Sequence, residues 1–426
     1  MPAGSPETGA TPAPRPTAGH WSRRFHGAMV VVHRYVGLAI ATFLVVASLT
    51  GSIVVFQHEL DAVVNPQLFT CTPPSADAVP LPPMALRDAL QAQLPPGIQV
   101  WETGLQPPEP GMAARFSLDW HGDDPPMTEA FVDPYTGRML GHRRWGDLGQ
   151  GLVNLLPFMY LLHVSLALGE VGRLLLGIVA LLWTIDCFVG FYLTLPARRA
   201  AGAGAGDGRS WLGRWKPSWL VKGGSLFGTI FTFHRASGLW VWPLLLMFAW
   251  SSVAILLRPV YDPVMGLFFR AAEHHNLPEL PEPRPHPRLS AAEGLARCQA
   301  LMEEEAAKRG IAIIRPVLFS HETHFGFYRY QVQSSLDITS TGGNTTIRID
   351  TDTGRLIGFD APVSDEPGDI FDTWLIYLHF GSVGGITYRI LICITGVLTA
   401  ILCVTGVIIW WKKRTLRRKA RARAAP

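Results

Sequence analysis

Four long apolar stretches dominate the chain and are separated by stretches rich in polar residues. They run from Met29 to Phe56, from Val171 to Leu195, from Leu226 to Leu257 and from Ile386 to Trp411. A helix that crosses a bilayer needs about 20 mostly apolar residues. The pattern therefore predicts four transmembrane helices. Two shorter apolar segments, from Leu152 to Leu168 and from Ile370 to Phe380, precede the second and fourth stretches, and each is either a further crossing or a helix at the membrane interface.

The distribution of basic residues decides between these two readings. They form three clusters: Arg15, Arg23, Arg24 and Arg34; Arg198, Arg199, Arg209, Arg214, Lys216 and Lys222; and Lys412, Lys413, Arg414, Arg417, Arg418 and Lys419. Basic residues beside membrane spans stay on the cytoplasmic side. Four crossings put all three clusters there, whereas a fifth crossing would put one outside. We therefore expect two interfacial helices and both termini in the cytoplasm.

This topology predicts an α-helical membrane protein with α+β extracytoplasmic domains. The expected parts are a disordered cytoplasmic tail (1–24), transmembrane helix 1 (25–60), a first outer domain (61–148), an interfacial helix with transmembrane helix 2 (149–196), a basic cytoplasmic linker (197–224), transmembrane helix 3 (225–258), a second outer domain (259–368), an interfacial helix with transmembrane helix 4 (369–412) and a basic cytoplasmic tail (413–426). The tail is expected to be disordered because Pro, Ala, Gly and Thr dominate it.

Composition narrows the class of protein further. Hydrophobic residues make up 48% of the chain and charged residues 16%, with a net charge of only +4. A soluble protein has about 25% charged residues. The composition therefore predicts contact with a lipid bilayer and does not indicate binding to nucleic acid. The five cysteines contain no CxxC pair, which excludes a zinc ribbon or a thioredoxin-type site. A disulfide between Cys71 and Cys298, both in the predicted outer domains, is left open.

Comparison of the chain with itself reveals a duplication. The segment HRYVGL at His33–Leu38 recurs as HRASGL at His234–Leu239, and YLLH ending at His163 recurs as IYLH ending at His379. The outer domains share a motif as well, since Val132–Arg138 resembles Ile349–Arg355 and each reads as strand, glycine turn and strand. Both halves have the same membrane direction. A pseudo-twofold axis along the membrane normal is therefore expected, with equivalent residues facing each other across it.

Among the fourteen histidines, only four obey the repeat: His33 with His234, and His163 with His379. An ionisable side chain in or beside a span is costly unless it is paired or used. Two equivalent imidazoles facing one axis can supply both axial ligands of a haem iron, and helices can form the apolar slot around the porphyrin. We therefore predict two haem sites, His33/His234 near the cytoplasmic face and His163/His379 near the opposite face.

Other polar residues in the apolar regions have weaker patterns. Arg34, Arg235, Arg173 and Arg389 are placed to meet haem propionates, because a guanidinium group matches a carboxylate. Orientation and snorkelling explain Arg34 and Arg235 equally well. His26 and His58 do not repeat, so a polar interface role is expected for them. The sequence assigns no role to Asp186, which lies inside the second span.

Together these features resemble the PepSY-associated transmembrane family of bacterial inner-membrane proteins. The matching residues are the HRxxGL openings at His33 and His234, the histidine segments at His163 and His379, the Asp-x-x-Thr-Gly-Arg turns that begin at Asp133 and Asp350, and the pairs Thr50-Gly51 and Thr405-Gly406. Ser252 departs from the repeat, because the first half has Gly51 at that position. The resemblance implies two PepSY-like periplasmic domains, two haem b groups and the reduction of imported ferric siderophores.

The preferred hypothesis is a dihaem b-type transmembrane reductase that passes electrons from a cytoplasmic donor or quinol to Fe(III) in a periplasmic siderophore. No GxGxxG or Walker motif is visible, so a separate electron donor is expected. Two alternatives stay open: a non-enzymatic periplasmic binding or accessory protein of siderophore uptake, and a siderophore or iron permease. The duplication suits a permease, but the sequence shows no broken helix and no acidic relay beyond Asp186.

Overall fold

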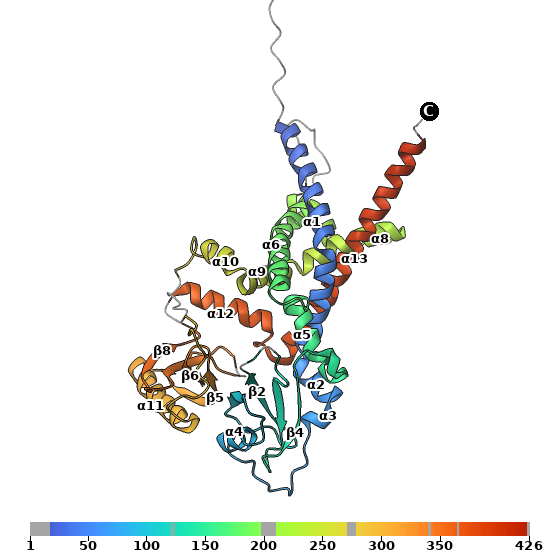
Figure 1. The fold of residues 1–426 in the computed structure, drawn as a ribbon. Helices are drawn as coiled ribbons and strands as arrows, with labels where there is room; N and C mark the ends of the chain where they lie inside the picture. Colours follow the sequence, from blue (N-terminus) through green and yellow to red (C-terminus); the bar gives the residue numbers. More distant parts are fainter. Residues whose placement is uncertain are drawn as a thin grey trace, which may run out of the picture. The chain divides into compact units, whose positions relative to one another are not determined.

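The computed structural model describes residues 18–120, 122, 124–196, 210–270, 278–339, 342–363 and 366–423 (Figure 1). The chain divides into two compact units. The first is built from Met1–Thr42, Leu182–Leu246 and Ile401–Pro426, and the second from Phe43–Leu181 and Met247–Ala400. Arg15, Arg198, Arg199 and Arg209 of the predicted basic clusters lie outside the described residues, as do most of the predicted N-terminal tail and part of the basic linker.

Three helices are long and apolar enough to cross a membrane: α1 (Ala18–Val54), α6 (Gly169–Thr194) and α13 (Gly385–Arg423). A fourth crossing is present if the bent pair α8 (Leu226–Trp240) and α9 (Trp242–Leu256) counts as one span. The helix α13 continues through the basic C-terminal segment as far as Arg423, so the described part of the predicted tail is helical.

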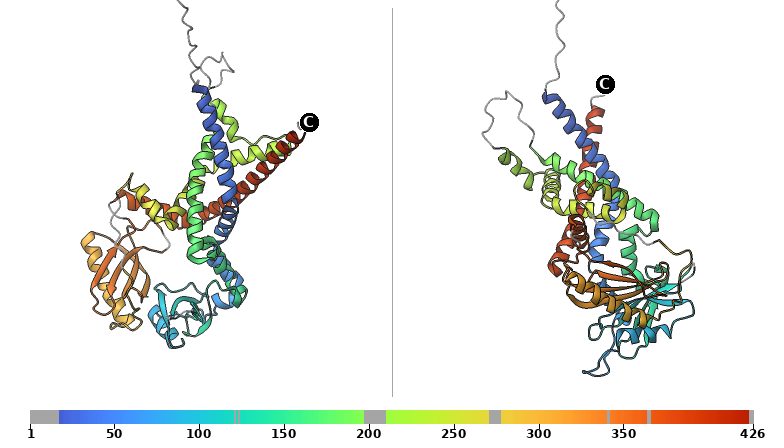
Figure 2. Two further views of the ribbon diagram at one scale, coloured as in Figure 1. Left: turned by 45° about the horizontal axis from the view of Figure 1, so that its top comes forward. Right: turned by 90° about the vertical axis from the view of Figure 1, so that its left-hand side faces the viewer.

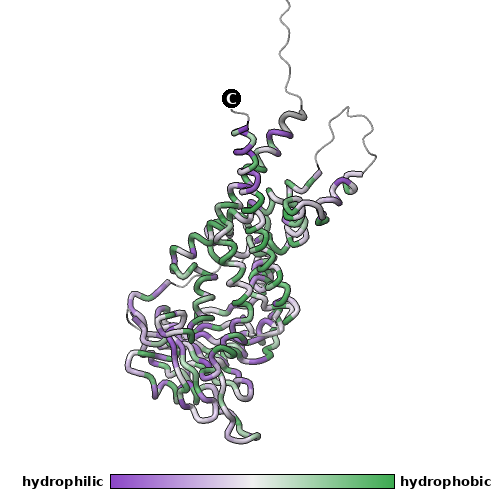
Figure 3. Tube along the Cα trace, turned by 90° about the vertical axis from the view of Figure 1, so that its right-hand side faces the viewer, coloured by the Kyte–Doolittle hydropathy of each residue, from purple (hydrophilic) through white to green (hydrophobic). Residues whose placement is uncertain are grey.

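Apolar side chains on these helices are exposed in rows. On α13 the exposed residues include Ile386, Ile390, Ile394, Val397, Ile401 and Val404. The three- to four-residue spacing places them on one side of the helix, and exposed apolar surface of this extent is typical of contact with lipid. Figure 3 shows the hydrophobic colour concentrated on the long helices, with a hydrophilic segment at the C-terminal end of α13. The chain is therefore built as a multi-pass membrane protein.

The third predicted span is broken, which the sequence analysis did not anticipate. The helices α8 and α9 meet at Val241 and are bent by 66°. The cause is Pro243 at the second position of α9. A proline has no N–H to donate to the preceding turn, and its ring clashes with the carbonyl four residues earlier. Pro243 therefore donates no helical hydrogen bond to the Leu239 carbonyl, and a new helix starts after the break.

The two short apolar segments form the separate helices α5 (Leu155–Ser165) and α12 (Pro367–Phe380), each of which ends one turn before a long apolar helix. Left-handed residues end both helices: Leu166 has φ 53° and Gly381 has φ 68°. The remaining helices are α2 (Gln57–Val64), α3 (Pro66–Phe69), α4 (Pro83–Gln91), α7 (Trp211–Trp215), α10 (Arg258–Met265) and α11 (Ala291–Arg309), with short 3-10 turns η1 (Leu148–Gln150), η2 (Leu152–Asn154) and η3 (Lys216–Trp219).

The polar segments between the apolar helices form one antiparallel sheet of eight strands. The strands are β1 (Ile98–Gly104), β2 (Ala114–Trp120), β3 (Glu129–Val132), β4 (Met139–Arg143), β5 (Ile313–Glu322), β6 (Phe327–Ser334), β7 (Thr345–Asp350) and β8 (Leu356–Asp360). Their order is β4-β3-β2-β1-β5-β6-β7-β8 (Figures 1 and 2). Each half of the duplication therefore supplies a helix followed by four sequential strands.

The two halves of the sheet meet where β1 pairs with β5 through Glu102–Gly104 and Leu318–Ser320. The sequence predicted an outer domain in each half, but not that their edge strands would join. A hydrophobic core lies under each helix: Leu86 and Leu90 of α4 pack on β1–β3, and Cys298 and Met302 of α11 pack on β5–β7. Cys71 and Cys298, for which a disulfide was left open, are both free thiols.

The repeated turn motif has the same structure in both halves. Asp133 accepts hydrogen bonds from the Tyr135 backbone N–H and the Thr136 hydroxyl, and Asp350 accepts them from the backbone N–H and hydroxyl of Thr353. The glycine that follows in each turn has a positive φ, a conformation that costs glycine little. The predicted strand, glycine turn and strand are therefore present between β3 and β4 and between β7 and β8.

Candidate functional site: two histidine pairs

The first pair of repeated histidines lies in the first compact unit. His33 belongs to α1 and His234 to α8, and their ring centres are 6.3 Å apart with the ring planes inclined by 60°. Both residues come from the HRxxGL segments. The structure therefore brings the two equivalent histidines of the duplication together.

Each of these imidazoles is held by its Nδ1 atom. His33 Nδ1 lies 2.9 Å from the Asp186 carboxylate on α6, and His234 Nδ1 lies 2.9 Å from the Thr405 hydroxyl oxygen on α13. The Thr405 hydroxyl donates its own hydrogen to the Ile401 carbonyl, so its oxygen accepts the Nδ1–H of His234. Both Nδ1 atoms are therefore protonated donors, and both Nε2 atoms keep a free electron pair for a metal.

Two equivalent glycines, which have no side chain, leave space beside these imidazoles. A Cβ atom added at Gly190 would lie 3.4 Å from His33 Cε1, and one added at Gly406 would lie 3.4 Å from His234 Cε1. Gly190 and Gly406 follow His163 and His379, the histidines of the second pair, by the same 27 residues. The duplication therefore preserves both the ring and the space beside it.

The second pair lies in the second compact unit and repeats this arrangement. His163 and His379 occupy the last turns of α5 and α12, with ring centres 6.3 Å apart and planes inclined by 47°. His163 Nδ1 lies 2.9 Å from the Ala47 carbonyl oxygen. His379 Nδ1 lies 2.6 Å from the Ser251 hydroxyl oxygen. The Ser251 hydroxyl in turn donates to the Phe248 carbonyl, so it accepts from His379.

The surroundings of the second pair are tighter than those of the first. A Cβ atom added at Gly51 would lie 2.8 Å from His163 Cε1, a distance that real Cβ contacts do not show. The Thr50 hydroxyl oxygen lies 3.5 Å from His163 Nδ1, at the position that Ser251 occupies in the second half. The rings of Phe248 and Phe380 meet the His379 ring edge to face at 5.5 Å and 5.8 Å.

The separation of the rings matches that required by one iron between two imidazoles. A bond of about 2.0 Å between a metal and an imidazole nitrogen, with about 1.1 Å more to the ring centre, places two rings about 6.2 Å apart across one metal. Both pairs measure 6.3 Å. The described residues contain no group of three or more His, Cys, Asp or Glu placed to hold a metal ion. Two imidazoles at each site fit a haem, because the porphyrin would supply the remaining nitrogen ligands of the iron.

The four arginines considered as propionate partners have different surroundings. Arg235 donates one hydrogen bond to the Pro217 carbonyl, and its buried Nε has no partner among the described residues. Arg34 follows His33 on α1 and is half-buried. Arg173 lies 3.5 Å from Glu170 and is 42% exposed. Arg389 is already engaged, since its guanidinium donates to the Glu59 carboxylate and to the Val55 carbonyl at the end of α1.

His26 and His58, which lie outside the repeat, have ring contacts with other aromatic residues. His26 is exposed, and its ring centre lies 6.0 Å from that of Tyr192. His58 is exposed, and its ring meets Phe69 at 5.9 Å.

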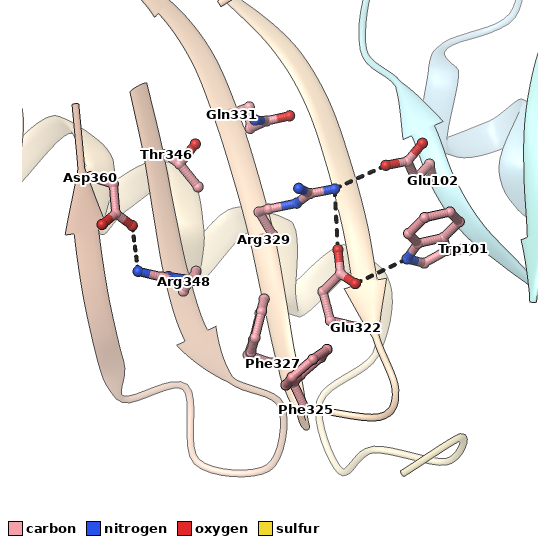
Figure 4. A pocket seen from close by; sticks show the side chains of 10 residues that line it. All are labelled: Trp101, Glu102, Glu322, Phe325, Phe327, Arg329, Gln331, Thr346, Arg348 and Asp360. Atoms are coloured by element: carbon pink, nitrogen blue, oxygen red, sulfur yellow. Dashed lines mark hydrogen bonds and ion pairs between the residues drawn. The ribbon is translucent and has the colours of Figure 1, made fainter. Parts of the chain in front are cut away.

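The second unit also carries an open pocket of about 490 Å³ on the sheet face opposite α4 and α11 (Figure 4). It is lined by Trp101, Glu102, Glu322, Phe325, Phe327, Arg329, Gln331, Thr346, Arg348 and Asp360, which come from β1 and from β5–β8. A register shift in β1 between Val100 and Glu102 aims these two side chains at opposite faces. Val100 enters the core under α4, and Glu102 faces the pocket.

Ion pairs cross this pocket. Arg329 lies 2.9 Å from Glu102 and 3.2 Å from Glu322, and the Trp101 indole donates to Glu322 at 3.2 Å. Burial raises the pKa of the Glu102 carboxyl; the cation of Arg329 opposes this shift and the anion of Glu322 adds to it. The pocket therefore combines aromatic surface with closely spaced charges, which Figure 4 shows bridging both halves of the sheet.

Sequence reasoning missed the pocket and the supports of the histidines. A signal for the pocket was present, because Phe327, Arg329 and Gln331 alternate with the buried Tyr328, Tyr330 and Val332 along one strand. The resemblance includes Thr50 and Thr405, but it does not predict their contacts with histidines. Asp186 stands out in the sequence only as a charge within an apolar span. The sequence pattern does not show that it contacts His33, which lies 153 positions earlier.

The comparison with curated proteins finds no match to this chain. The family model of the PepSY-associated TM region matches residues 30–413, which include both histidine pairs and the whole sheet. The chain thus belongs to the family of proteins with the PepSY-associated TM region.

Proposed function

We propose that this protein is a dihaem transmembrane electron-transfer protein that reduces Fe(III) in ferric siderophores. The observation that carries the proposal is the pair of equivalent 6.3 Å ring separations, each with both Nδ1 atoms occupied. A structural histidine needs no equivalent partner at metal-bridging distance. Four histidines arranged as two such pairs, with acceptors that fix the same tautomer in each, are typical of metal ligation.

A haem bound by each pair would supply one-electron transfer between Fe(II) and Fe(III). The residues of the chain supply the rest. His33, His234, His163 and His379 would hold the haem iron, and their Nδ1 partners fix the ring orientations. Electron transfer of this kind needs no nucleophile and no acid–base pair. Each ferric ion takes one electron, so one quinol, which releases two electrons and two protons, suffices for two ferric ions; a reduced cytoplasmic carrier is the other class of donor.

The proposed topology has four crossings, both termini in the cytoplasm and the sheet in the periplasm of a bacterial inner membrane. Each half would contribute one PepSY-like domain, formed by α4 with β1–β4 and by α11 with β5–β8. Support comes from the basic clusters beside the helices and from the hydrophilic C-terminal end of α13. The His163/His379 pair shares its compact unit with the sheet, which suits a role on the substrate side.

The pocket on the sheet is the proposed substrate site. Its lining carries three carboxylates, from Glu102, Glu322 and Asp360, against the guanidinium groups of Arg329 and Arg348, together with three aromatic rings. This balance favours a neutral or cationic ferric hydroxamate over a strongly anionic ferric catecholate. Iron leaves after reduction because hard oxygen ligands hold Fe(III) more tightly than Fe(II). Calorimetric titration with both kinds of chelate would test the preference, and tighter binding of the catecholate would contradict it.

Haem content tests the central proposal. Purified wild-type protein should contain two haem b groups per chain by pyridine haemochrome against protein mass. H163A or H379A should lower this to one, and so should H33A or H234A. The control is H58A, which alters a histidine outside the repeat and should keep both. A wild-type protein without haem, or single variants that all keep two, would refute the proposal.

A siderophore or iron permease is the second candidate, favoured by the broken pair α8 and α9. Discontinuous helices line the substrate sites of many transporters. Uptake of a labelled ferric siderophore into sealed proteoliposomes separates the two proposals. A reductase leaves the chelate outside and produces Fe(II), whereas a permease moves the intact chelate and needs no haem.

A further inference from the structure

Asp186 places an acidic side chain inside the apolar stretch of α6 that follows Arg173. It lies in α6 within the segment Leu181–Gly190, and its carboxylate is only 10% exposed. A carboxylate at such a position is costly and is kept where it pairs or acts. Its partner is His33 Nδ1 at 2.9 Å. A Cβ atom added at Gly37, one turn further along α1, would lie 3.8 Å from the same carboxylate, so α1 approaches α6 closely beside it.

The other three repeated histidines have neutral acceptors. His163 donates to the Ala47 carbonyl, His379 to the Ser251 hydroxyl, and His234 to the Thr405 hydroxyl. Among the four proposed ligands, only His33 therefore has an anionic acceptor.

This difference is not a product of the duplication. In the second half, Leu402 stands at the position equivalent to Asp186, and in the first half Val189 stands at the position equivalent to Thr405. The histidine and the adjacent glycine are duplicated, while the group that accepts from the imidazole differs in both chemistry and place. Holding the imidazoles in place does not by itself require a carboxylate, because the Thr405 hydroxyl holds His234 without a charge.

A carboxylate that accepts the Nδ1–H of a metal-bound imidazole makes that imidazole a stronger electron donor. Greater donation, and a negative charge near the iron, stabilise the ferric form relative to the ferrous form. Because the surroundings are apolar, this effect is screened less than it would be in water. An alcohol or a peptide carbonyl orients the ring in the same way but adds no charge.

We propose that Asp186 is a positioning residue that lowers the reduction potential of the His33/His234 haem below that of the His163/His379 haem. This inference rests on the proposed function, in which each histidine pair binds a haem. With haem bound at both pairs, the lower potential at His33/His234 would make that site the electron donor and His163/His379 the acceptor. The carboxylate thereby gives a direction to a pair of sites that the duplication made alike in geometry.

Redox titration of the purified protein, followed by the haem absorption bands, tests this. D186N keeps an acceptor oxygen of the same shape but removes the charge. D186N should keep two haems and raise the reduction potential of one of them by at least about 59 mV, which corresponds to a tenfold change in its one-electron equilibrium constant. The potential of the other haem should stay unchanged. The H379A variant, which keeps only the first haem, assigns the shifted signal. T405V, which removes the neutral acceptor of His234, should shift the same potential less.

Two further measurements keep the test decisive. Electron paramagnetic resonance of the ferric D186N protein should show g values close to those of the wild type, because these values follow the angle between the two imidazole planes. A shifted potential with unchanged g values then reports the lost charge, whereas a purely structural role of Asp186 would change the g values. If D186N loses that haem, D186E decides: a bound haem with a wild-type potential supports the proposal, and any other result overturns it. Unchanged potentials in a D186N protein with two haems also overturn it. A wild-type protein without haem refutes the proposed function itself, which is a distinct result.

Discussion

The two halves of the chain agree in their repeated histidines and differ in what supports them. Both pairs have ring centres 6.3 Å apart. Beside the histidines, Gly51 in the first half is replaced by Ser252 in the second and Asp186 by Leu402. In the sheet, Arg143 of the first half is replaced by Asp360. The duplication therefore preserved the geometry that two ligands need, whereas the surrounding contacts diverged. Exchanging residues between equivalent positions is the direct way to examine this difference.

The largest effect is expected from giving the first half the residue of the second at Gly51. In G51S the new Cβ would lie 2.8 Å from His163 Cε1, and His163 is held in place by the Ala47 carbonyl. The ring must move, so haem content should fall from two to one per chain by pyridine haemochrome. The reverse exchange S252G adds no atoms and should keep two. Two haems per chain in G51S would contradict this prediction, because the His163 ring would then have moved without loss of the haem.

The next largest effect concerns the sheet. Arg143 is fully buried on β4, where it lies 2.6 Å from Asp61 and 2.6 Å from Glu129. Removing one partner of a buried network leaves uncompensated charges, so R143M should cost about 3–5 kcal/mol of unfolding free energy. Urea titration of the purified protein, followed by circular dichroism, measures this loss.

The matched control in the second half is Arg348, whose pair with Asp360 is partly exposed. R348M should cost only about 0–1 kcal/mol, because solvent screens such pairs. Equal losses in R143M and R348M would mean that the two halves of the sheet are supported alike.

The smallest effect is expected at Glu59. Its hydrogen bond with Arg389 lowers the pKa of the Glu59 carboxyl below its ordinary value of 4.5. A lowered folded-state pKa contributes stability above the unfolded pKa, and this contribution is lost as the pH falls through the folded-state pKa. E59Q should therefore lower the melting temperature at pH 7 and have no effect near pH 2. The loss should stay within about 1 kcal/mol, because the pair is largely exposed.

The control for Glu59 is Glu170, which lies beside Arg173, the equivalent of Arg389, and is 92% exposed. E170Q should leave the melting temperature unchanged at both pH values. A pH-independent effect of E59Q would show that shape, and not the ion pair, matters there.

The sequence was sufficient for the long helices, the family and the pairing of the histidines. Periodic apolar length defines a span, and a duplicated residue such as His163 carries information about its twin because symmetry relates them. It was not sufficient for features that depend on contacts between distant segments. The hydrogen bond between Asp186 and His33 is one example, and the reorientation of Glu102 by an irregular strand is another. The break before Pro243 had a local signal that apolar length concealed.

The joining of β1 to β5 has a consequence for how the chain avoids self-association. A strand at the edge of a sheet offers unpaired backbone groups to any other chain. Two separate four-stranded sheets would have four such edges, whereas the single sheet leaves only β4 and β8 at its ends. A half-length chain would leave β1 as an unpaired edge, open to pairing with a second copy. The duplication thus encloses within one polypeptide a contact that two molecules would otherwise have to find by diffusion.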